Sequence, residues 1–277
     1  MRNPTGIKRA AFAAFLIFTA MVFSLGISAE VIGVPCIMYH SVKPSPDSEF
    51  SISPSVFEAD MYYLKRHGYE TISLGELASR VAGGKPIPER SVLITFDDGY
   101  SDVLYNALPI LNKYGYRAVM AVTVSSIGKN FSTFPHMTEY ELKIMKNSGI
   151  FELANHSYDL HRLDDRVGSS IKPGEAVGEY RKILTRDLST AFDALSRLGV
   201  VNVKAYAYPY CAVSNESVAV LEALGVEAAL TGEVLPQGAE QSDVLFIRRI
   251  CRNGTHTTER FFRYFDKVFG RAEKSSN

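Results

Sequence analysis

Residues 91–99 read Ser-Val-Leu-Ile-Thr-Phe-Asp-Asp-Gly, an apolar run that ends in two adjacent carboxylates and a glycine. A short apolar run of this kind is typical of a strand buried in a parallel sheet. An extended strand would point Asp97 and Asp98 to opposite faces, but Gly99 lets the chain turn directly after them. The stretch therefore predicts a buried strand whose end brings two carboxylates to one place.

The rest of the chain alternates similar strands with helical patterns. Signals for two-residue hairpins are missing and connections of helical length separate the strands, so we expect a largely parallel sheet. The pattern predicts an irregular (β/α) barrel of about seven parallel strands in a single domain, with an open doubly wound sheet as the alternative. We expect Ser55 to cap the first helix and residues 166–175 to form a surface loop. The predicted strands are 33–39, 91–96, 117–124, 150–155, 203–208, 227–230 and 244–250, and the predicted helices are 55–67, 104–115, 138–147, 174–198, 214–225 and 258–269.

Polar or aromatic motifs follow three of these strands directly. Asp97-Asp98 follows one, His156 follows another, and Tyr208-Pro209-Tyr210 follows a third. Both candidate architectures bind ligands at the carboxyl ends of their strands, so we expect the three motifs to share one edge. His156 and His161 are five positions apart, which suits neither one face of a helix nor one face of a strand, so they must lie on a curved loop to converge.

Two imidazoles and two carboxylates at one edge supply a metal ligand set and one spare base. A divalent metal held by two histidines and one carboxylate, with a position left open, makes water a better nucleophile and polarises a carbonyl. A second carboxylate within reach can take the proton as water attacks an amide or ester. Zinc is the default metal for such a site, and cobalt, nickel or iron also suit it.

Each of these residues also has an ordinary structural interpretation. Asp98 could be only a turn carboxylate before Gly99, and the histidines could be surface or hydrogen-bonded core residues. Tyr208–Tyr210 could be a packed turn, or a wall on which a sugar ring stacks, with a backbone N–H available to a developing oxyanion. His40 directly follows the first strand, where it would make either a structural hydrogen bond or a substrate contact.

Composition and charge restrict the partners. The 30 basic and 30 acidic side chains cancel, so no net field favours nucleic acid, and a neutral substrate fits better. The three cysteines, Cys36, Cys211 and Cys251, form neither a disulfide framework nor a zinc ribbon; one pair could bridge, or all could be packed thiols.

Residues 1–29 differ from the remainder. Arg2, Lys8 and Arg9 precede an uncharged, mostly apolar stretch over 10–27, and Ser28-Ala29-Glu30 follows. This pattern predicts a signal peptide, with an uncleaved membrane anchor as the alternative. Either form places residues 30–277 outside the cytoplasm, secreted or tethered to a membrane only through the N-terminal segment.

Taken together, the motifs resemble those of the polysaccharide deacetylases (NodB homology domain, carbohydrate esterase family 4). The resemblance rests on Thr95–Gly99, on His156–His161, on Tyr208–Tyr210 and on Met38-Tyr39-His40, and it covers about residues 32–251. It implies a deformed βα barrel that hydrolyses carbon–nitrogen bonds other than peptide bonds. The expected reaction removes N-acetyl groups from N-acetylglucosamine polymers such as peptidoglycan, chitin or poly-N-acetylglucosamine.

The resemblance also implies roles for individual residues. By motif position, Asp98, His156 and His161 would bind the metal and Asp97 would be the catalytic base. The backbone amide of Tyr210 would help to hold the oxyanion. From their places at the strand ends, and not from the resemblance, we expect Tyr208, Pro209 and His40 to contact the polysaccharide.

The chain departs from the family pattern in four places. The five-residue histidine spacing is similar to that of the poly-N-acetylglucosamine deacetylases, which favours that branch. Ala207 stands where the family often has an arginine that orients the base, and Cys211 replaces a glycine. The late Leu-x-His motif that supplies a general acid is not evident, which leaves His40 or His256 as candidates. These departures keep two alternatives open: a catalytically impaired glycan-binding or assembly protein, and an O-acetyl esterase acting on a glycan.

Overall fold

The computed structural model describes residues 34–131, 134–199, 204–233 and 244–269. The described residues form one compact unit. The predicted signal peptide or anchor lies outside the described residues. Within the described ranges, no helix combines the length and apolar character needed to cross a membrane.

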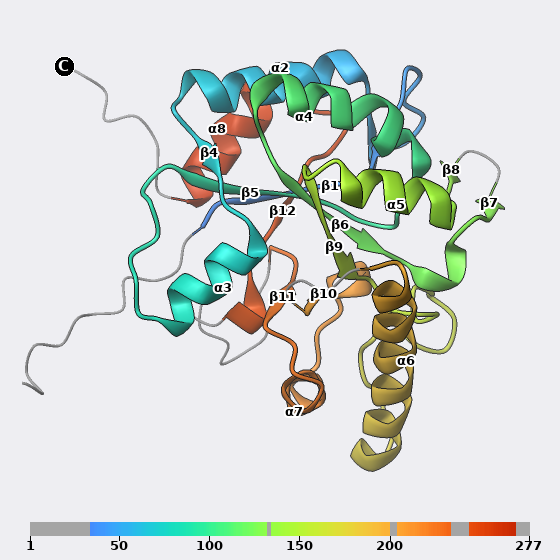
Figure 1. The fold of residues 1–277 in the computed structure, drawn as a ribbon. Coiled ribbons are helices and arrows are strands. Elements are labelled where there is room, and N and C mark those ends of the chain that lie inside the picture. The colour runs from blue at the N-terminus through green and yellow to red at the C-terminus, as the bar shows by residue number, and fades with distance from the viewer. Residues whose placement is uncertain (1–33, 132–133, 200–203, 234–243, 270–277) are drawn as a thin grey trace, which may run out of the picture. The chain divides into compact units, whose positions relative to one another are not determined.

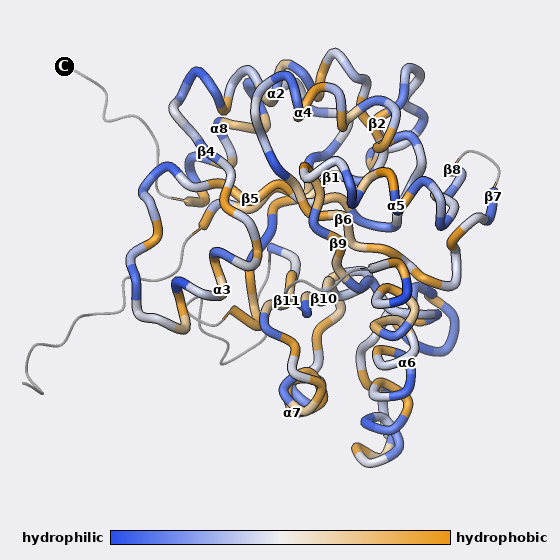
Figure 2. The backbone as a smooth tube through the Cα atoms, in the orientation of Figure 1, coloured by the Kyte–Doolittle hydropathy of each residue, from blue (hydrophilic) through white to orange (hydrophobic). Residues whose placement is uncertain are grey.

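The centre of this unit is a parallel sheet (Figure 1). Its strands run in the order β11-β10-β9-β6-β5-β1-β12, and β4 pairs with the beginning of β5. Every residue of β5 and β6 is buried, because helices pack on the sheet, and the apolar colour of Figure 2 is concentrated along the strands. The strand bounds are β1 Cys36–Tyr39, β4 Glu70–Thr71, β5 Ser91–Phe96, β6 Ala118–Val122, β9 Phe151–Asn155, β10 Ala205–Ala207, β11 Ala228–Leu230 and β12 Ile250–Cys251.

The sheet curls so that residues 247–251 reach both of its ends. Ile247 bridges to Leu230 of β11, whereas Ile250 and Cys251 pair with β1. This arrangement confirms the prediction of an irregular α/β barrel in a single domain. The strand predicted over 244–250 was wrong, however: Val244–Phe246 is a 3-10 turn (η4), and β12 holds only two residues. The segment changes partner from β11 to β1 within three residues, so it cannot continue one ladder.

Helices connect the strands, as predicted. They are α2 Pro54–Arg66, α3 Leu74–Ala82, α4 Leu108–Tyr114, α5 Glu139–Asn147, α6 Val177–Arg197, α7 Asn215–Ala223 and α8 Thr258–Val268, with a π-helical turn, η1 Val103–Ala107, leading into α4. Ser53, not the predicted Ser55, caps α2, because Pro54 takes the first helical position and the Ser53 hydroxyl accepts the Val56 N–H. Helix α3 was not predicted from the sequence.

Shorter elements decorate the carboxyl edge of the sheet. They are β2 Ser41–Val42 with β3 Ser51–Ile52, β7 Asn130–Phe131 with β8 Phe134–Pro135, and the 3-10 turns η2 Val124–Ser126 and η3 Pro209–Cys211. Residues 166–175 are more than the predicted surface loop, because Arg166 is buried and its guanidinium binds the Glu175 carboxylate. The backbone of this loop lies directly against η3. A side chain at Gly168 would not fit there, because its Cβ would lie 2.4 Å from Pro209 O.

Candidate metal centre

The three predicted motifs meet at the carboxyl ends of β5, β9 and β10, which lie in one continuous stretch of the sheet with β6 between β5 and β9. The turns that carry them are held in an unusual backbone conformation. Among the described residues, only four non-glycine residues have positive φ, namely Asp98, Ser157, Tyr210 and Cys211, and all four belong to these turns. Such strain persists where the surrounding structure imposes it, and it is concentrated at functional sites.

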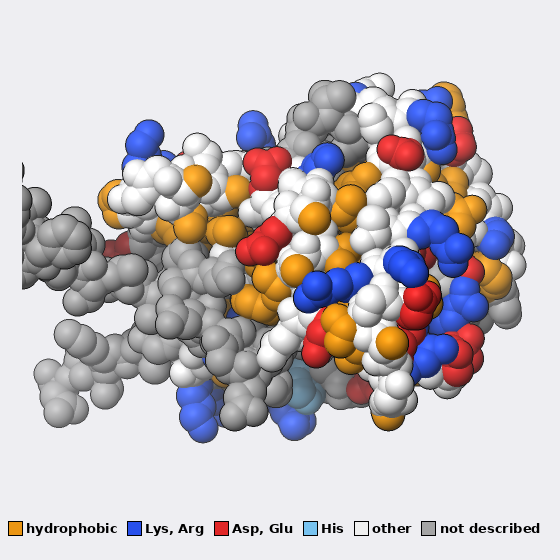
Figure 3. Space-filling view, turned by 90° about the horizontal axis from the view of Figure 1, so that it is seen from below, with side chains coloured by type: hydrophobic (Ala, Val, Ile, Leu, Met, Phe, Trp, Pro, Cys, Tyr) orange, Lys and Arg blue, Asp and Glu red, His pale blue; other side chains and the backbone are white. Residues whose placement is uncertain are grey.

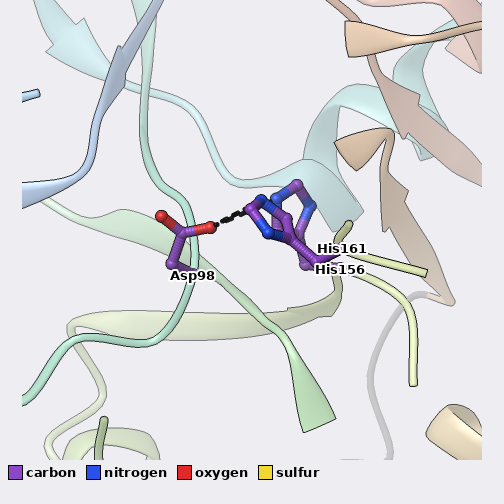
Figure 4. Close-up of side chains that lie close together, drawn as sticks. All are labelled: Asp98, His156 and His161. Atoms are coloured by element: carbon purple, nitrogen blue, oxygen red, sulfur yellow. Dashed lines mark ion pairs between the residues drawn. The ribbon is translucent and has the colours of Figure 1, made fainter. Parts of the chain in front are cut away.

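Asp98, His156 and His161 come together as the sequence predicted (Figure 4). One potential ligand atom from each residue lies within 4.8 Å of the others. Asp98 Oδ1 is 3.5 Å from His156 Nε2 and 3.1 Å from His161 Nε2. The described residues thus contain one carboxylate and two imidazoles that converge on a common point.

The orientation of these side chains fits a metal ion. His156 Nδ1 lies 2.8 Å from Ala207 O, and the hydrogen bond to this carbonyl leaves the Nε2 lone pair facing the cluster. Asp98 Oδ1 is buried without a hydrogen-bond partner although both Nε2 atoms are near it. A buried carboxylate oxygen that makes no hydrogen bond is costly, and a cation between the three groups would satisfy it.

The electrostatics keep the cluster ready to bind a cation. Burial lowers the pKa of His156 to about 4, so this imidazole is neutral near pH 7. Burial alone would raise the pKa of Asp98, but the facing imidazoles of His161 and His40 hold it well below its usual value. Burial would also lower the pKa of His161, and the Asp98 carboxylate outweighs this effect and raises it.

Asp97 is held by a residue that the sequence analysis missed. Arg249 Nη1 and Nη2 donate to the two carboxylate oxygens of Asp97 at 2.7 and 2.8 Å, and both side chains are buried. Burial acts to raise the pKa of Asp97, but the guanidinium charge and its hydrogen bonds lower it. Asp97 Oδ2 is 3.9 Å from His156 Nε2, so an ionised carboxylate stands beside the cluster. The available signal was the pair Arg248-Arg249 between the apolar residues Ile247 and Ile250.

The Tyr208–Tyr210 turn contributes differently from the prediction. Tyr208 and Pro209 are buried, and the Tyr208 hydroxyl hydrogen-bonds Ser217, so their side chains do not form an exposed wall. The exposed ring is that of Tyr210, whose centroid lies 4.4 Å from that of His161. Cys211 and Ala212 donate the turn's hydrogen bonds to Tyr208 O and Pro209 O, respectively.

The remaining histidines lie at different distances from the cluster. His40 packs against Phe50 and is close enough for its charge to lower the pKa of Asp97 and Asp98. His256 lies beside Arg252 and Arg260 instead, with its carbonyl accepting from Arg252. His136, which the sequence did not single out, lines a cleft and has a buried Nδ1 without a hydrogen-bond partner.

That cleft opens directly onto the cluster. It has a volume of about 330 Å³, and its lining includes Asp98, His161, Tyr100, Phe131, Phe134 and His136. The Tyr100 ring lies 4.9 Å from the rings of both Phe134 and His136. The site thus combines polar ligand atoms with flat apolar surfaces, as small-molecule and sugar sites commonly do.

A barrel with a convergent carboxylate–imidazole cluster at the carboxyl ends of its strands defines a candidate metalloprotein of the α/β class. The chain belongs to the polysaccharide deacetylase family, whose family model matches residues 84–229. This confirms the family expected from the motifs.

Individual relatives agree with that assignment. A poly-β-1,6-N-acetyl-D-glucosamine N-deacetylase of Staphylococcus aureus is 31% identical over 180 residues, which are 64% of this chain and 60% of the relative. The BpsB deacetylase domain from Bordetella bronchiseptica is 27% identical, with a TM-score of 0.63 over 79% of this chain and 95% of that domain. IcaB from Ammonifex degensii shares the fold, with 24% identity and a TM-score of 0.71 over 86% of this chain and 97% of that one. The chain spans only 60 to 64% of the length of the curated relatives it matches first.

Proposed function

We propose that this protein is a metal-dependent hydrolase that removes N-acetyl groups from an N-acetylglucosamine-containing polysaccharide. The observation that carries the proposal is the convergence of the buried Asp98 Oδ1 with two imidazole nitrogens, 3.5 and 3.1 Å away, with the ionised Asp97 beside them. Family membership and a relative named as a poly-N-acetylglucosamine deacetylase support this substrate class. On the face seen in Figure 3, acidic and basic side chains are interspersed, which suits a neutral polymer better than a strongly charged one.

In this proposal Asp98, His156 and His161 hold the metal. When bound there, a divalent cation, with zinc as the default, would polarise the acetamide carbonyl and make water more acidic. Asp97 accepts the proton of the attacking water, and Arg249 keeps this carboxylate ionised and fixed in orientation. The Tyr210 N–H donates to the oxygen that becomes negatively charged.

The sugar ring would bind in the cleft beside the cluster. We assign the exposed Tyr210 ring and the Tyr100–Phe134 pair as its contact surfaces, in place of the buried Tyr208 and Pro209. His40 remains a candidate for substrate contact or for protonating the leaving amine. Residues 30–277 would be the catalytic domain, acting outside the cytoplasm after export directed by residues 1–29.

The first test is acetate release by residues 30–277 from peptidoglycan, chitooligosaccharides and poly-N-acetylglucosamine, after chelation and after metal add-back. We expect release only with metal, and most from poly-N-acetylglucosamine. Tight glycan binding without acetate release at saturating metal would reject the enzyme in favour of a binding protein, and release from O-acetylated glycans alone would indicate an esterase.

Two single variants separate the proposed roles of the adjacent carboxylates. Asp98→Ala should lose bound metal and activity together, because it removes one of three ligands. Asp97→Asn should keep metal at wild-type stoichiometry and lower turnover by roughly 10²- to 10⁴-fold, the usual contribution of a positioned base. Metal analysis of both purified proteins alongside acetate release checks this; equal activity in the two variants would contradict the assignment.

A further inference from the structure

The loop that joins the two metal-binding histidines has every one of its backbone N–H groups hydrogen-bonded to a side chain. The Ser157 N–H donates to Asn155 Oδ1, and the Leu160 N–H donates to the Ser157 hydroxyl. Between them, the Tyr158 and Asp159 N–H groups donate to Asp187 Oδ1 and Oδ2 at 2.8 and 2.9 Å. Of the three accepting residues, only Asp187 lies outside both the loop and strand β9, which precedes the loop.

Asp187 lies on α6, which contacts both β9 and η2. Two successive N–H groups that follow a left-handed residue form a concave anion-binding site, and Ser157 supplies that conformation with a φ of 74°. The Asp187 carboxylate fills this site and binds both N–H groups at once. On the other side of the loop, the carbonyls of Ser157 and Tyr158 accept from Val124 and Ser125 of η2. The loop is therefore clamped between α6 and η2.

This clamp has unequal consequences for the two histidines. The ring of His156 is fixed independently, because it is buried and bonded to Ala207 O. The side chain of His161 is 25% exposed. The place of its backbone depends on the path that residues 157–160 take. A five-residue spacing matches neither a helix face nor a strand face, so the curvature of this loop determines where His161 Nε2 points.

We propose that Asp187 is a positioning residue for the metal site: its carboxylate fixes the curvature that brings His161 to Asp98 and His156. The inference rests on the proposed metal site and extends it to a residue of α6 that lies outside all three motifs. Groups that orient metal ligands without touching the metal commonly contribute 10- to 100-fold to affinity.

The decisive variant is Asp187→Asn, which has nearly the same shape. Its amide nitrogen is a donor and would face the N–H of Tyr158 or Asp159, so one of the two hydrogen bonds becomes a repulsion. Asp193→Asn is the matched control, because Asp193 is an exposed aspartate on the same helix. We would measure Zn²⁺ affinity by competition with a chromophoric chelator, the visible spectrum of the Co²⁺-loaded protein, and thermal unfolding without metal.

We expect Asp187→Asn to bind Zn²⁺ about 10- to 100-fold more weakly than Asp193→Asn and to show an altered Co²⁺ spectrum, while the two metal-free proteins unfold at similar temperatures. Equal Zn²⁺ affinities and identical spectra would overturn the role of Asp187. A fall in affinity matched by a general loss of the metal-free fold would also overturn it, since the effect would then not be specific to the loop.

Hydrogen exchange in the wild-type protein tests the same clamp without a variant. The Tyr158 and Asp159 amides should be protected to the same degree as those of neighbouring β9, and exchange at the rate of an exposed loop would reject the proposal. His156→Ala separates this test from that of the metal site itself. If His156→Ala binds Zn²⁺ as wild type does, the proposed site is wrong; if it does not, and Asp187→Asn binds normally, only the positioning role fails.

Discussion

Arg249 changes the interpretation of Asp97. Ala207 stands where relatives often have an arginine that orients the base, and from the sequence this position looked like a lost function. In the folded protein the guanidinium arrives instead from the segment before β12, outside residues 84–229 that the family model matches. Charged groups buried in pairs with good geometry can sit far apart in sequence, so motif spacing alone could not reveal this partner.

Replacing Arg249 should change the pH dependence of activity. The guanidinium lowers the pKa of Asp97, and as the proposed base Asp97 would be active only when ionised, above that pKa. Arg249→Lys keeps the charge but cannot donate two parallel hydrogen bonds, and Arg249→Gln removes the charge. The acid limb of the kcat/KM profile should therefore move to higher pH in both variants, further in Arg249→Gln.

Arg248→Gln is the control for this prediction, because Arg248 is adjacent in sequence but, within the part of the chain that the structure describes, it pairs with Glu233 at 4.0 Å and not with Asp97. Its acid limb should coincide with that of the wild type. An unchanged profile in Arg249→Gln, with metal still bound, would mean that Asp97 is not the group whose ionisation limits turnover.

At the scale of whole elements, a second buried ion pair joins α2 to the segment that follows β12. Arg252 beside β12 donates to Asp60 of α2 at 2.7 Å, and both side chains are fully buried. Asp60 also accepts from Tyr39 of β1 and from Thr258 of α8. The Asp60 carboxylate on α2 thus binds β1, the segment after β12 and α8 at once.

Breaking this pair from one side should be costly. Arg252→Met leaves the Asp60 carboxylate buried without its main partner, which typically lowers the free energy of unfolding by about 3–5 kcal/mol. Urea unfolding measures this change, with Arg260→Met on the exposed part of α8 as the control, expected within about 0.5 kcal/mol of wild type. The double variant Asp60→Leu/Arg252→Met should recover part of the loss; if it is less stable than Arg252→Met, the uncompensated charge is not the cause.

The elements that the sequence predicted share strong local signals. Helix α5 has a complete capping box at Thr138 and Glu141, and β5 is a continuous apolar run, so both were found. Helix α3 is short and contains Gly75, which weakens its helical pattern, although Ser73 caps it. The segment 244–250 is apolar enough for a strand, but its partner changes in mid-course, which only the closed sheet determines.

The same distinction holds for the candidate site. The strand-end rule placed Asp97, Asp98, His156 and Tyr210 together, because parallel strands end at one edge. It could not show that Tyr208 points into the core, since the side that a residue faces depends on the exact turn. Nor could it find Arg249 or Asp187, which contribute through contacts more than 25 positions away in the chain.

At the scale of the whole molecule, the candidate metal centre joins turns after β5 and β9, so a bound ion should stabilise the entire fold. A ligand that binds only the folded state adds about 2.7 kcal/mol at a concentration one hundred times its Kd. For a domain of this size that is a rise in Tm of about 5–10 °C. Calorimetry with and without Zn²⁺ should show this rise, and His156→Ala should abolish it.

The pH dependence of Zn²⁺ binding should show that one proton is released when the metal binds. Metal binding needs neutral imidazoles and an ionised carboxylate. His156, with a pKa of about 4, is already neutral at pH 5–7, and Asp98 is ionised throughout because its pKa is lowered. The pKa of His161 is raised by Asp98, so this imidazole is protonated on the acid side and must release its proton before a metal can bind.

We therefore expect Zn²⁺ affinity, measured between pH 5 and 7, to fall about tenfold for each pH unit below the pKa of His161. A slope of two protons would mean that His156 also titrates in this range, and a flat profile would exclude His161 as a ligand.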